Sequence, residues 1–245
     1  AYSEGGLALC LYGARLMDDQ HTHPDEQKRM EAGKLLDLLT PVIKAWPSEY
    51  GPKANDLAIQ VYGGAGYTRE YPVEQCWRDN RLNPIHEGTN GIQALDLLGR
   101  KIWQDQSHGL QLLMQEMQVD LQAAITERCQ QWALSLSETL QQAVKVTQSL
   151  GKSLMGGEVD KTLANASCYL HLFGHIIVAW MWLRQANASA NALASANSDS
   201  ERNFYQGKLQ AAQYFFHWEL PTVAQDLVLL RNQDDTCLNM KADWF

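Results

Sequence analysis

Residues 110–144 read LQLLMQEMQVDLQAAITERCQQWALSLSETLQQAV and contain neither proline nor glycine. Apolar side chains recur in this segment every three or four positions, which is the period of one face of an α-helix. They are Leu110, Leu113, Met114, Met117, Leu121, Ala124, Ile125, Trp132, Leu136, Leu140 and Val144. The segment therefore predicts one long amphipathic helix and favours a fold built from helices.

Toward the N-terminus the same period continues, although prolines interrupt it. Residues 3–20 predict a helix, and a second helix begins at Glu26. Trp46-Pro47 and Gly51-Pro52 are typical of turns. After these turns, Asn55 or Asp56 would cap a short helix.

Toward the C-terminus, residues 158–186 and 201–231 predict two further helices, separated by an Ala-, Asn- and Ser-rich linker at 187–200. No run of alternating apolar and polar residues indicates a strand, so the predicted fold class is all-α. The composition changes after Trp103.

The composition narrows the class of protein. The chain has 245 residues, with 28 acidic residues against 20 lysines and arginines, so its formal net charge is −8. Apolar types make up 45% and charged types 20%, which excludes collagen-like, disulfide-scaffold and wholly disordered chains. Since general nucleic-acid binders need positive charge to neutralise phosphates, we expect no nucleic-acid partner.

The cysteine and histidine patterns predict no metal site. The five cysteines are scattered without a C-x-x-C pair, which indicates reduced thiols in an intracellular protein. His171 and His175 lie four residues apart but lack the intervening glutamate of a zinc protease, so we interpret them as core histidines.

The most apolar stretch, residues 168–183, is shorter than the roughly 20 residues of a membrane span and predicts a buried core helix instead of a transmembrane segment. We expect no transmembrane segment and a cytoplasmic location. No signal peptide is visible at the N-terminus, and the missing initiator methionine indicates processing or a fragment.

The helical period disappears between Gly63 and Gly91, where five glycines and two prolines occur. Residues 60–67 read QVYGGAGY and are followed by EYPVE at 70–74. Glycines after a helix can form its C-terminal cap alone. They can also expose backbone N–H groups that a pyrophosphate approaches closely. Both interpretations stay open on these residues alone.

A second glycine-bearing segment, residues 83–93, reads NPIHEGTNGIQ. Thr89 or Asn90 would cap the helix that follows. Glu87 could be an exposed acid that the helix dipole favours. It could also be a general base that the turn, with Gly88 beside it, directs into a pocket.

Taken together, the two segments resemble the C-terminal domain of the acyl-CoA dehydrogenases, whose motifs are a Q-x-x-G-G-x-G-Y/F…E-Y/F-P-V-E loop followed by an E-G-T turn. The resemblance covers residues 1–105, which it implies form a helical bundle, and it implies an additional helical domain over residues 106–245. Residues 87–101, EGTNGIQALDLLGRK, are most similar to a bacterial branch that carries an additional C-terminal helical domain. That branch includes the enzyme that acts on 3-methylmercaptopropionyl-CoA.

The resemblance implies FAD-dependent α,β-dehydrogenation of an acyl-CoA thioester to the 2-enoyl-CoA. Glu87 matches the catalytic glutamate that removes the α-proton while a hydride leaves the β-carbon for flavin N5. Gly88 and His86 would contribute to substrate binding. His86 replaces a frequent tyrosine, so it either shapes the acyl pocket or is an ordinary hydrogen-bonded histidine.

The same resemblance assigns the cofactor-binding residues. Gln60, Gly63 and Gly64 match positions that contact the ADP half of an FAD held largely by a neighbouring subunit. Thr89 matches a position that contacts the flavin. Gly91 stands where the family commonly has a polar or acidic residue, so a side-chain contact to FAD is lost there.

The resemblance further implies an N-terminal helical domain, a β-barrel domain and a first bundle helix that this chain lacks. We therefore expect a folded C-terminal fragment without activity of its own, from a homodimer or homotetramer that passes electrons to an electron-transfer flavoprotein. Two alternatives stay open. One is an acyl-CoA oxidase-like enzyme, and the other is a non-catalytic helical assembly module, suggested by the aromatic content of residues 169–218.

Overall fold

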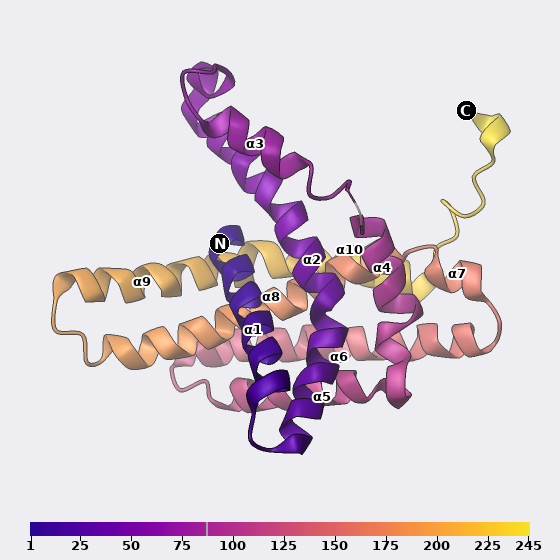
Figure 1. Cartoon of the computed structure of the whole chain (residues 1–245), viewed down its shortest axis with the longest axis horizontal. Coiled ribbons are helices and arrows are strands. Elements are labelled where there is room, and N and C mark those ends of the chain that lie inside the picture. Colours follow the sequence, from indigo (N-terminus) through magenta and orange to yellow (C-terminus); the bar gives the residue numbers. More distant parts are fainter. Residues whose placement is uncertain (87) are drawn as a thin grey trace.

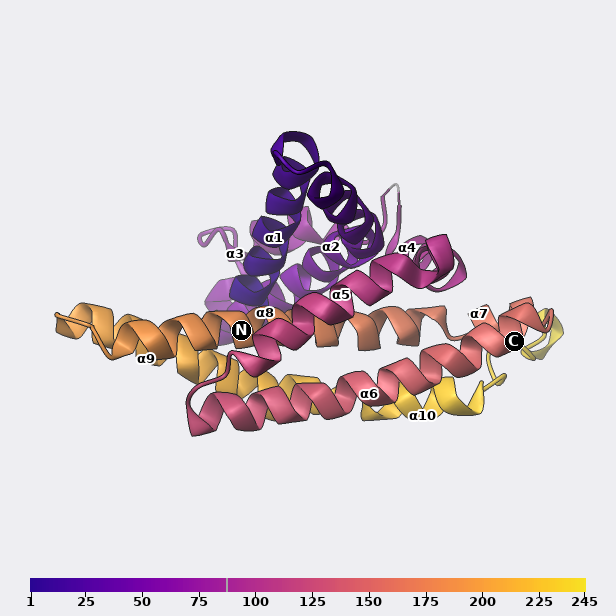
Figure 2. The same cartoon turned by 90° about the horizontal axis from the view of Figure 1, so that it is seen from below.

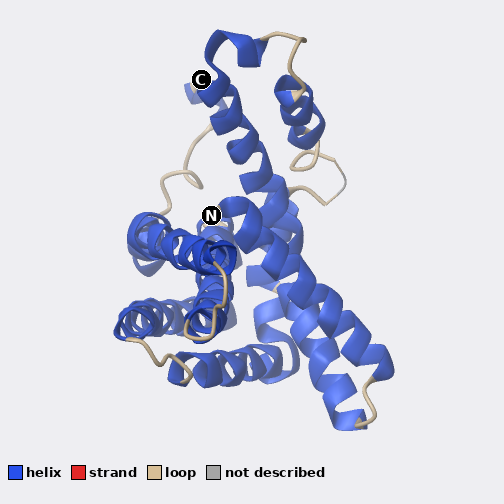
Figure 3. Cartoon of the chain, turned by 90° about the vertical axis from the view of Figure 1, so that its left-hand side faces the viewer, coloured by secondary structure: helices blue, strands red, loops and turns tan. Residues whose placement is uncertain are grey.

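The computed structural model describes residues 1–86 and 88–245. Across those ranges the chain consists of helices and connecting loops without a strand, so the predicted all-α class is confirmed (Figure 3). The α-helices are α1 (Tyr2–Thr22), α2 (Glu26–Tyr62), α3 (Val73–Arg81), α4 (Asn90–Gly99), α5 (Gln104–Gln122), α6 (Glu127–Met155), α7 (Val159–Leu163), α8 (Ala166–Leu193), α9 (Asp199–Tyr214) and α10 (Ala224–Asn232). Short 3₁₀ segments are η1 (Gly63–Tyr67), η2 (Lys101–Trp103), η4 (Leu220–Val223) and η5 (Ala242–Trp244), and η3 (Phe215–Glu219) is a π-helical segment.

Helix α8 lies at the centre of the molecule. It packs on α1, α2 and α4 and also contacts α5, α6, α9 and α10, so the N-terminal and C-terminal helices share one core. Figures 1 and 2 show the C-terminal helices lying across the antiparallel pair α1 and α2. A helix with neighbours all around it must be apolar on every face. Side chains of α8 such as Trp180, Trp182 and Ile177 are fully buried.

The burial of α8 confirms the predicted core helix. By length and composition alone it could cross a membrane, but 83% of its most apolar window is buried inside the structure. Most aromatic side chains that suggested an assembly module, including Tyr169, Phe173 and Phe215, belong to this core. Phe204 and Trp218 are exposed.

Helix α2 is continuous where the sequence predicts turns. It passes through Pro41, Pro47 and Pro52, so the predicted turns and the short helix capped at residue 55 or 56 are wrong. A proline inside a helix removes one hydrogen bond and costs about 3 kcal/mol or more. The burial of Trp46 and Tyr50 from α2 in the core offsets this cost.

The predicted helix over 110–144 is instead two helices. Helix α5 ends at Gln122 and α6 starts after Thr126, whose side chain accepts a hydrogen bond from the Cys129 N–H at 3.3 Å. Apolar spacing continues across the break, so periodicity does not detect it. The predicted helix over 201–231 is likewise divided, since the π-helical and 3₁₀ segments before Ala224 separate α9 from α10.

The C-terminal end of α2 projects from the body together with η1 and α3, and we call these residues, 55–81, the arm (Figure 1). At its base Asn80 donates a side-chain hydrogen bond to Oδ1 of Asn55 at 2.9 Å. Helix α3 lies inside the region where the sequence shows no helical period, so an interpretation of residues 63–91 as loops alone is wrong.

Candidate functional site

The predicted cofactor-binding residues Gln60, Gly63 and Gly64 lie at the tip of the arm. Gly63 ends α2 with φ at +60°, a conformation that favours glycine. Gly66 is buried, and a Cβ there would lie 2.6 Å from the Ile59 carbonyl oxygen. A Cβ on Gly64 would meet no described atom within 4 Å, and Gln60 beside it is exposed. The tip therefore presents bare backbone to the outside.

The predicted residues His86, Gly88 and Thr89 lie directly before α4. Glu87 lies outside the described residues, and His86 before it is exposed. Gly88 follows with φ at +76°, again a glycine conformation. Thr89 is the N-cap residue, as predicted, because its carbonyl oxygen accepts the Gln93 N–H at 3.0 Å. Its side chain makes no capping hydrogen bond to any described residue.

The structure does not bring these two groups into one cluster. Gln60, Gly63 and Gly64 lie at the end of the arm, whereas Gly88 and Thr89 lie beside the body at the start of α4. Figure 1 shows the two regions apart, with α3 between them. Within this chain, the two groups of predicted residues therefore do not form a single site.

A cavity of about 300 Å³ lies between α2, α4, α8 and α10. Its apolar lining includes Val42, Ala45, Trp46 and Leu170. Its polar lining includes Glu49, Asn90, His171 and Asp226. The lining residues from α2 and α10 are far from Asn90 in the sequence, and no sequence motif predicts that they lie together.

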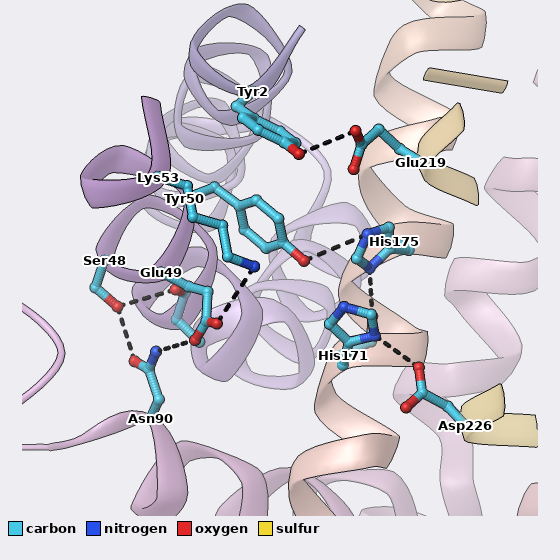
Figure 4. Close-up of polar contacts among 11 residues, drawn as sticks. Tyr2, Ser48, Glu49, Tyr50, Lys53, Asn90, His171, His175, Glu219 and Asp226 are labelled. Atoms are coloured by element: carbon cyan, nitrogen blue, oxygen red, sulfur yellow. Dashed lines mark hydrogen bonds and ion pairs between the residues drawn. The ribbon is translucent and has the colours of Figure 1, made fainter. Parts of the chain in front are cut away.

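The two histidines of α8 have structural hydrogen bonds (Figure 4). His175 is 1% exposed, and burial lowers its pKa to about 3, so the ring is neutral near pH 7. Its Nδ1 donates to the His171 carbonyl oxygen at 2.9 Å, and its Nε2 accepts from the Tyr50 hydroxyl at 3.3 Å. His171 contacts a carboxylate oxygen of Asp226 at 2.6 Å.

These contacts agree with the interpretation of His175 as a core histidine, while His171 lies at the edge of the core with 34% of its side chain exposed. Residues 1–86 and 88–245 hold no group of three or more His, Cys, Asp or Glu side chains that could bind a metal ion.

Comparisons with known proteins identify the two parts of the chain. Residues 4–102 match the family model "Acyl-CoA dehydrogenase, C-terminal domain". Residues 113–241 match the model "Acetyl-CoA dehydrogenase C-terminal like". The division at residues 105 and 106 itself stays a prediction.

Full-length relatives give the same family. The chain is 30% identical to the broad-specificity linear acyl-CoA dehydrogenase FadE5 of Mycobacterium tuberculosis, over 98% of this chain and 40% of that protein. It is 28% identical to the 3-methylmercaptopropionyl-CoA dehydrogenase of Ruegeria pomeroyi, over 88% of this chain and 36% of that protein. The chain thus spans about two-fifths of the length of these curated relatives.

A solved structure shares the fold. The acyl-CoA dehydrogenase of Bacillus anthracis, crystallised in complex with FAD, superimposes with a TM-score of 0.56 at 18% identity. The match covers 93% of this chain and 44% of the other. With the family models and the long relatives in agreement, the chain belongs to the acyl-CoA dehydrogenase family.

Proposed function

We propose that this chain is the C-terminal part of an FAD-dependent acyl-CoA dehydrogenase that converts an acyl-CoA thioester to the 2-enoyl-CoA. The observation that carries the proposal is the pair of glycine-bearing turns, at the arm tip and before α4, inside the segment matched by the family's C-terminal domain model. The length of the relatives supports a longer polypeptide that supplies the remaining walls of the active site.

Glu87 is the proposed catalytic base. The α-proton of a thioester is weakly acidic, so a base must be held close to it in a site from which water is excluded. Glu87 would take the α-proton, and the electron pair of that C–H bond would form the new double bond as a hydride leaves the β-carbon. Gly88 and His86 would contact the substrate beside it.

FAD is the proposed cofactor, and it supplies the acceptor for the hydride when bound. The arm tip fits such a group because the backbone of Gly64 is exposed and a Cβ there would meet no described atom within 4 Å. Gly63 and Gln60 at the same tip are also exposed. Backbone of this kind lets a pyrophosphate approach N–H groups closely. Thr89 fits a contact to the flavin, since its hydroxyl is not used as a helix cap within the described chain.

The separation of the two groups supports a proposed assembly of at least two subunits. Residues at the arm tip would contact the ADP half of an FAD bound by a neighbouring subunit, while Thr89 would contact the flavin of its own subunit. A homodimer or homotetramer in the cytoplasm, with an electron-transfer flavoprotein as electron acceptor, fits this arrangement.

The proposal is tested by comparing this chain with the full-length polypeptide that contains it. We expect the full-length protein to be yellow and to form 2-enoyl-CoA from acyl-CoA with an artificial electron acceptor. We expect the 245-residue chain to fold but to be colourless and inactive. A full-length protein without flavin or dehydrogenase activity would contradict the proposal, and an active yellow 245-residue chain would contradict the need for other domains. Peroxide formed in step with turnover would identify the oxidase-like alternative.

A further inference from the structure

The turn after residue 87 is held from inside α4 by Gln93. The side-chain amide of Gln93 donates a hydrogen bond to the Gly88 carbonyl oxygen at 2.9 Å. Gln93 is 6% exposed, so breaking this bond would leave a buried amide without its partner. A Cβ on Gly88 would lie 3.0 Å from Nε2 of Gln93, so glycine at this position also leaves room for the bond.

The same turn is held from α2 through Asn90, the first residue of α4 (Figure 4). Oδ1 of Asn90 lies 2.7 Å from the Ser48 hydroxyl, and its Nδ2 donates to a carboxylate oxygen of Glu49 at 2.9 Å. Ser48 is buried, and its hydroxyl also lies 2.9 Å from the Ala45 carbonyl oxygen. Glu49 in turn lies 3.6 Å from Nζ of Lys53.

These contacts restrain the start of α4 in two ways. The Gln93 bond fixes the peptide at Gly88, and the Asn90 bonds tie the first helical residue to a neighbouring helix. All of the tethering side chains are on helices, which hold a site more firmly than loops do. Gly88 and Asn90 are therefore tied to helices α4 and α2, although they lie at a connection between helices.

We infer that Asn90 and Gln93 are positioning residues for the carboxylate of Glu87. The inference rests on the proposed function of Glu87 as the base. This role requires no contact between either side chain and substrate or flavin. Their role is to hold the backbone that follows Glu87, because a displacement of about 1 Å in a reacting group can cost on the order of a hundredfold in rate.

The first test replaces Gln93 and compares it with a matched glutamine. Gln130 in the first turn of α6 donates a similar bond to the Ala124 carbonyl oxygen at 3.3 Å, far from the proposed site in the sequence. In the full-length enzyme, Gln93→Met should lower kcat by roughly 10- to 100-fold with the FAD content and the KM for acyl-CoA unchanged. Gln130→Met should leave kcat unchanged. In the 245-residue chain, Gln93→Met should speed amide hydrogen exchange at the start of α4.

The second test reverses the Asn90–Glu49 hydrogen bond. Asn90→Asp removes the donor and places two carboxylates together, and it should lower kcat in the same way. Since an acidic residue in the first turn is favoured by the helix dipole, α4 itself should not be weakened. The double variant Asn90→Asp with Glu49→Gln restores a donor and an acceptor in exchanged positions, and it should recover most of the lost kcat.

The outcomes separate this inference from the function on which it rests. An active wild-type enzyme whose Gln93→Met variant matches Gln130→Met in kcat would overturn the inference alone. So would an Asn90→Asp variant that loses kcat without recovery in the double variant. A full-length wild-type protein without dehydrogenase activity would overturn the proposed function and this inference with it.

Discussion

The Tyr50 hydroxyl donates to Nε2 of His175 across 3.3 Å, and this bond joins α2 to α8 within the shared core. The Trp46 ring packs against the same imidazole, with ring centroids 5.1 Å apart. Burial favours the neutral imidazole at this point, because a second proton would place a positive charge in the core and remove the Nε2 lone pair that accepts the Tyr50 hydroxyl.

Stability should therefore fall in mild acid. The pKa of His175 is about 3 in the folded chain against an ordinary value of 6.5, so the unfolded chain binds more protons between these pH values. Stability is complete above pH 6.5 and declines as the pH falls toward 3. At pH 5 the loss from this residue is about 2 kcal/mol, at about 1.4 kcal/mol per pH unit. Urea unfolding at pH 7 and pH 5 measures it.

The matched variants for that experiment are His175→Gln and His217→Gln, since His217 is exposed. The difference in stability between pH 7 and pH 5 should shrink in His175→Gln and stay as in the wild type in His217→Gln. Equal pH dependence in all three proteins would show that His175 is not held neutral by burial.

The bare backbone at the arm tip can be tested without disturbing the fold. Gly64→Ala adds a methyl group that meets no described atom within 4 Å, as does Gly207→Ala in α9. If FAD covers Gly64 in the full-length enzyme, Gly64→Ala should weaken FAD binding at least tenfold, about 1.4 kcal/mol. Gly207→Ala should leave FAD binding unchanged. Fluorescence titration of the apoenzyme with FAD gives both values, and equal affinities would remove Gly64 from the cofactor site.

Close approach of α1 to α8 depends on Gly5. A Cβ at this position would lie 2.7 Å from Nε1 of Trp182 and from Cγ1 of Val178. We expect Gly5→Ala to lower the free energy of unfolding by about 1–3 kcal/mol through overpacking. Gly207→Ala in the open part of α9 should raise it by up to about 1 kcal/mol, because alanine favours a helix interior over glycine. Urea unfolding of the 245-residue chain checks both signs, and stabilisation by Gly5→Ala would refute the tight contact.

Left-handed backbone precedes the regular part of α5. Asp105, Gln106 and Ser107 have φ values of 48°, 57° and 63°, and none of them is glycine. A left-handed conformation costs roughly 1–2 kcal/mol per non-glycine residue. We therefore expect Gln106→Gly to raise stability, by about 0.5–1 kcal/mol.

The opposite sign is expected for Gln115→Gly on the exposed side of α5, where glycine lowers stability by about 0.5–1 kcal/mol in a right-handed helix. Denaturant midpoints of the two variants measure the contrast. Destabilisation of similar size in both variants would mean that the backbone at residue 106 is not left-handed in the folded chain.

Sequence periodicity predicted the helices whose apolar faces reach the core, and it failed where local signals compete with burial. The prolines of α2 are local turn signals, but the buried Trp46 and Tyr50 hold the helix together around them. The break before α6 leaves the apolar spacing intact, and only Thr126, a good N-cap residue, marks it.

The candidate site divides in a similar way. Gly63 and Gly88 could be singled out from the sequence, because glycine is the residue that most readily adopts positive φ. Both have positive φ in the structure. The tie of Asn90 to Ser48 could not be predicted, because it joins residues 42 positions apart whose meeting depends on how α2 packs on α4. Long-range hydrogen bonds of this kind have no spacing rule in a single sequence.

The central claim is that the carboxylate of Glu87 removes the substrate α-proton, and Glu87→Gln in the full-length enzyme tests it most directly. The change keeps the shape of the side chain and removes the base. We predict that the variant stays yellow with FAD and loses acyl-CoA turnover by roughly 10²- to 10⁴-fold, the usual contribution of a general base. Turnover equal to that of the wild type, with FAD bound, would contradict the claim.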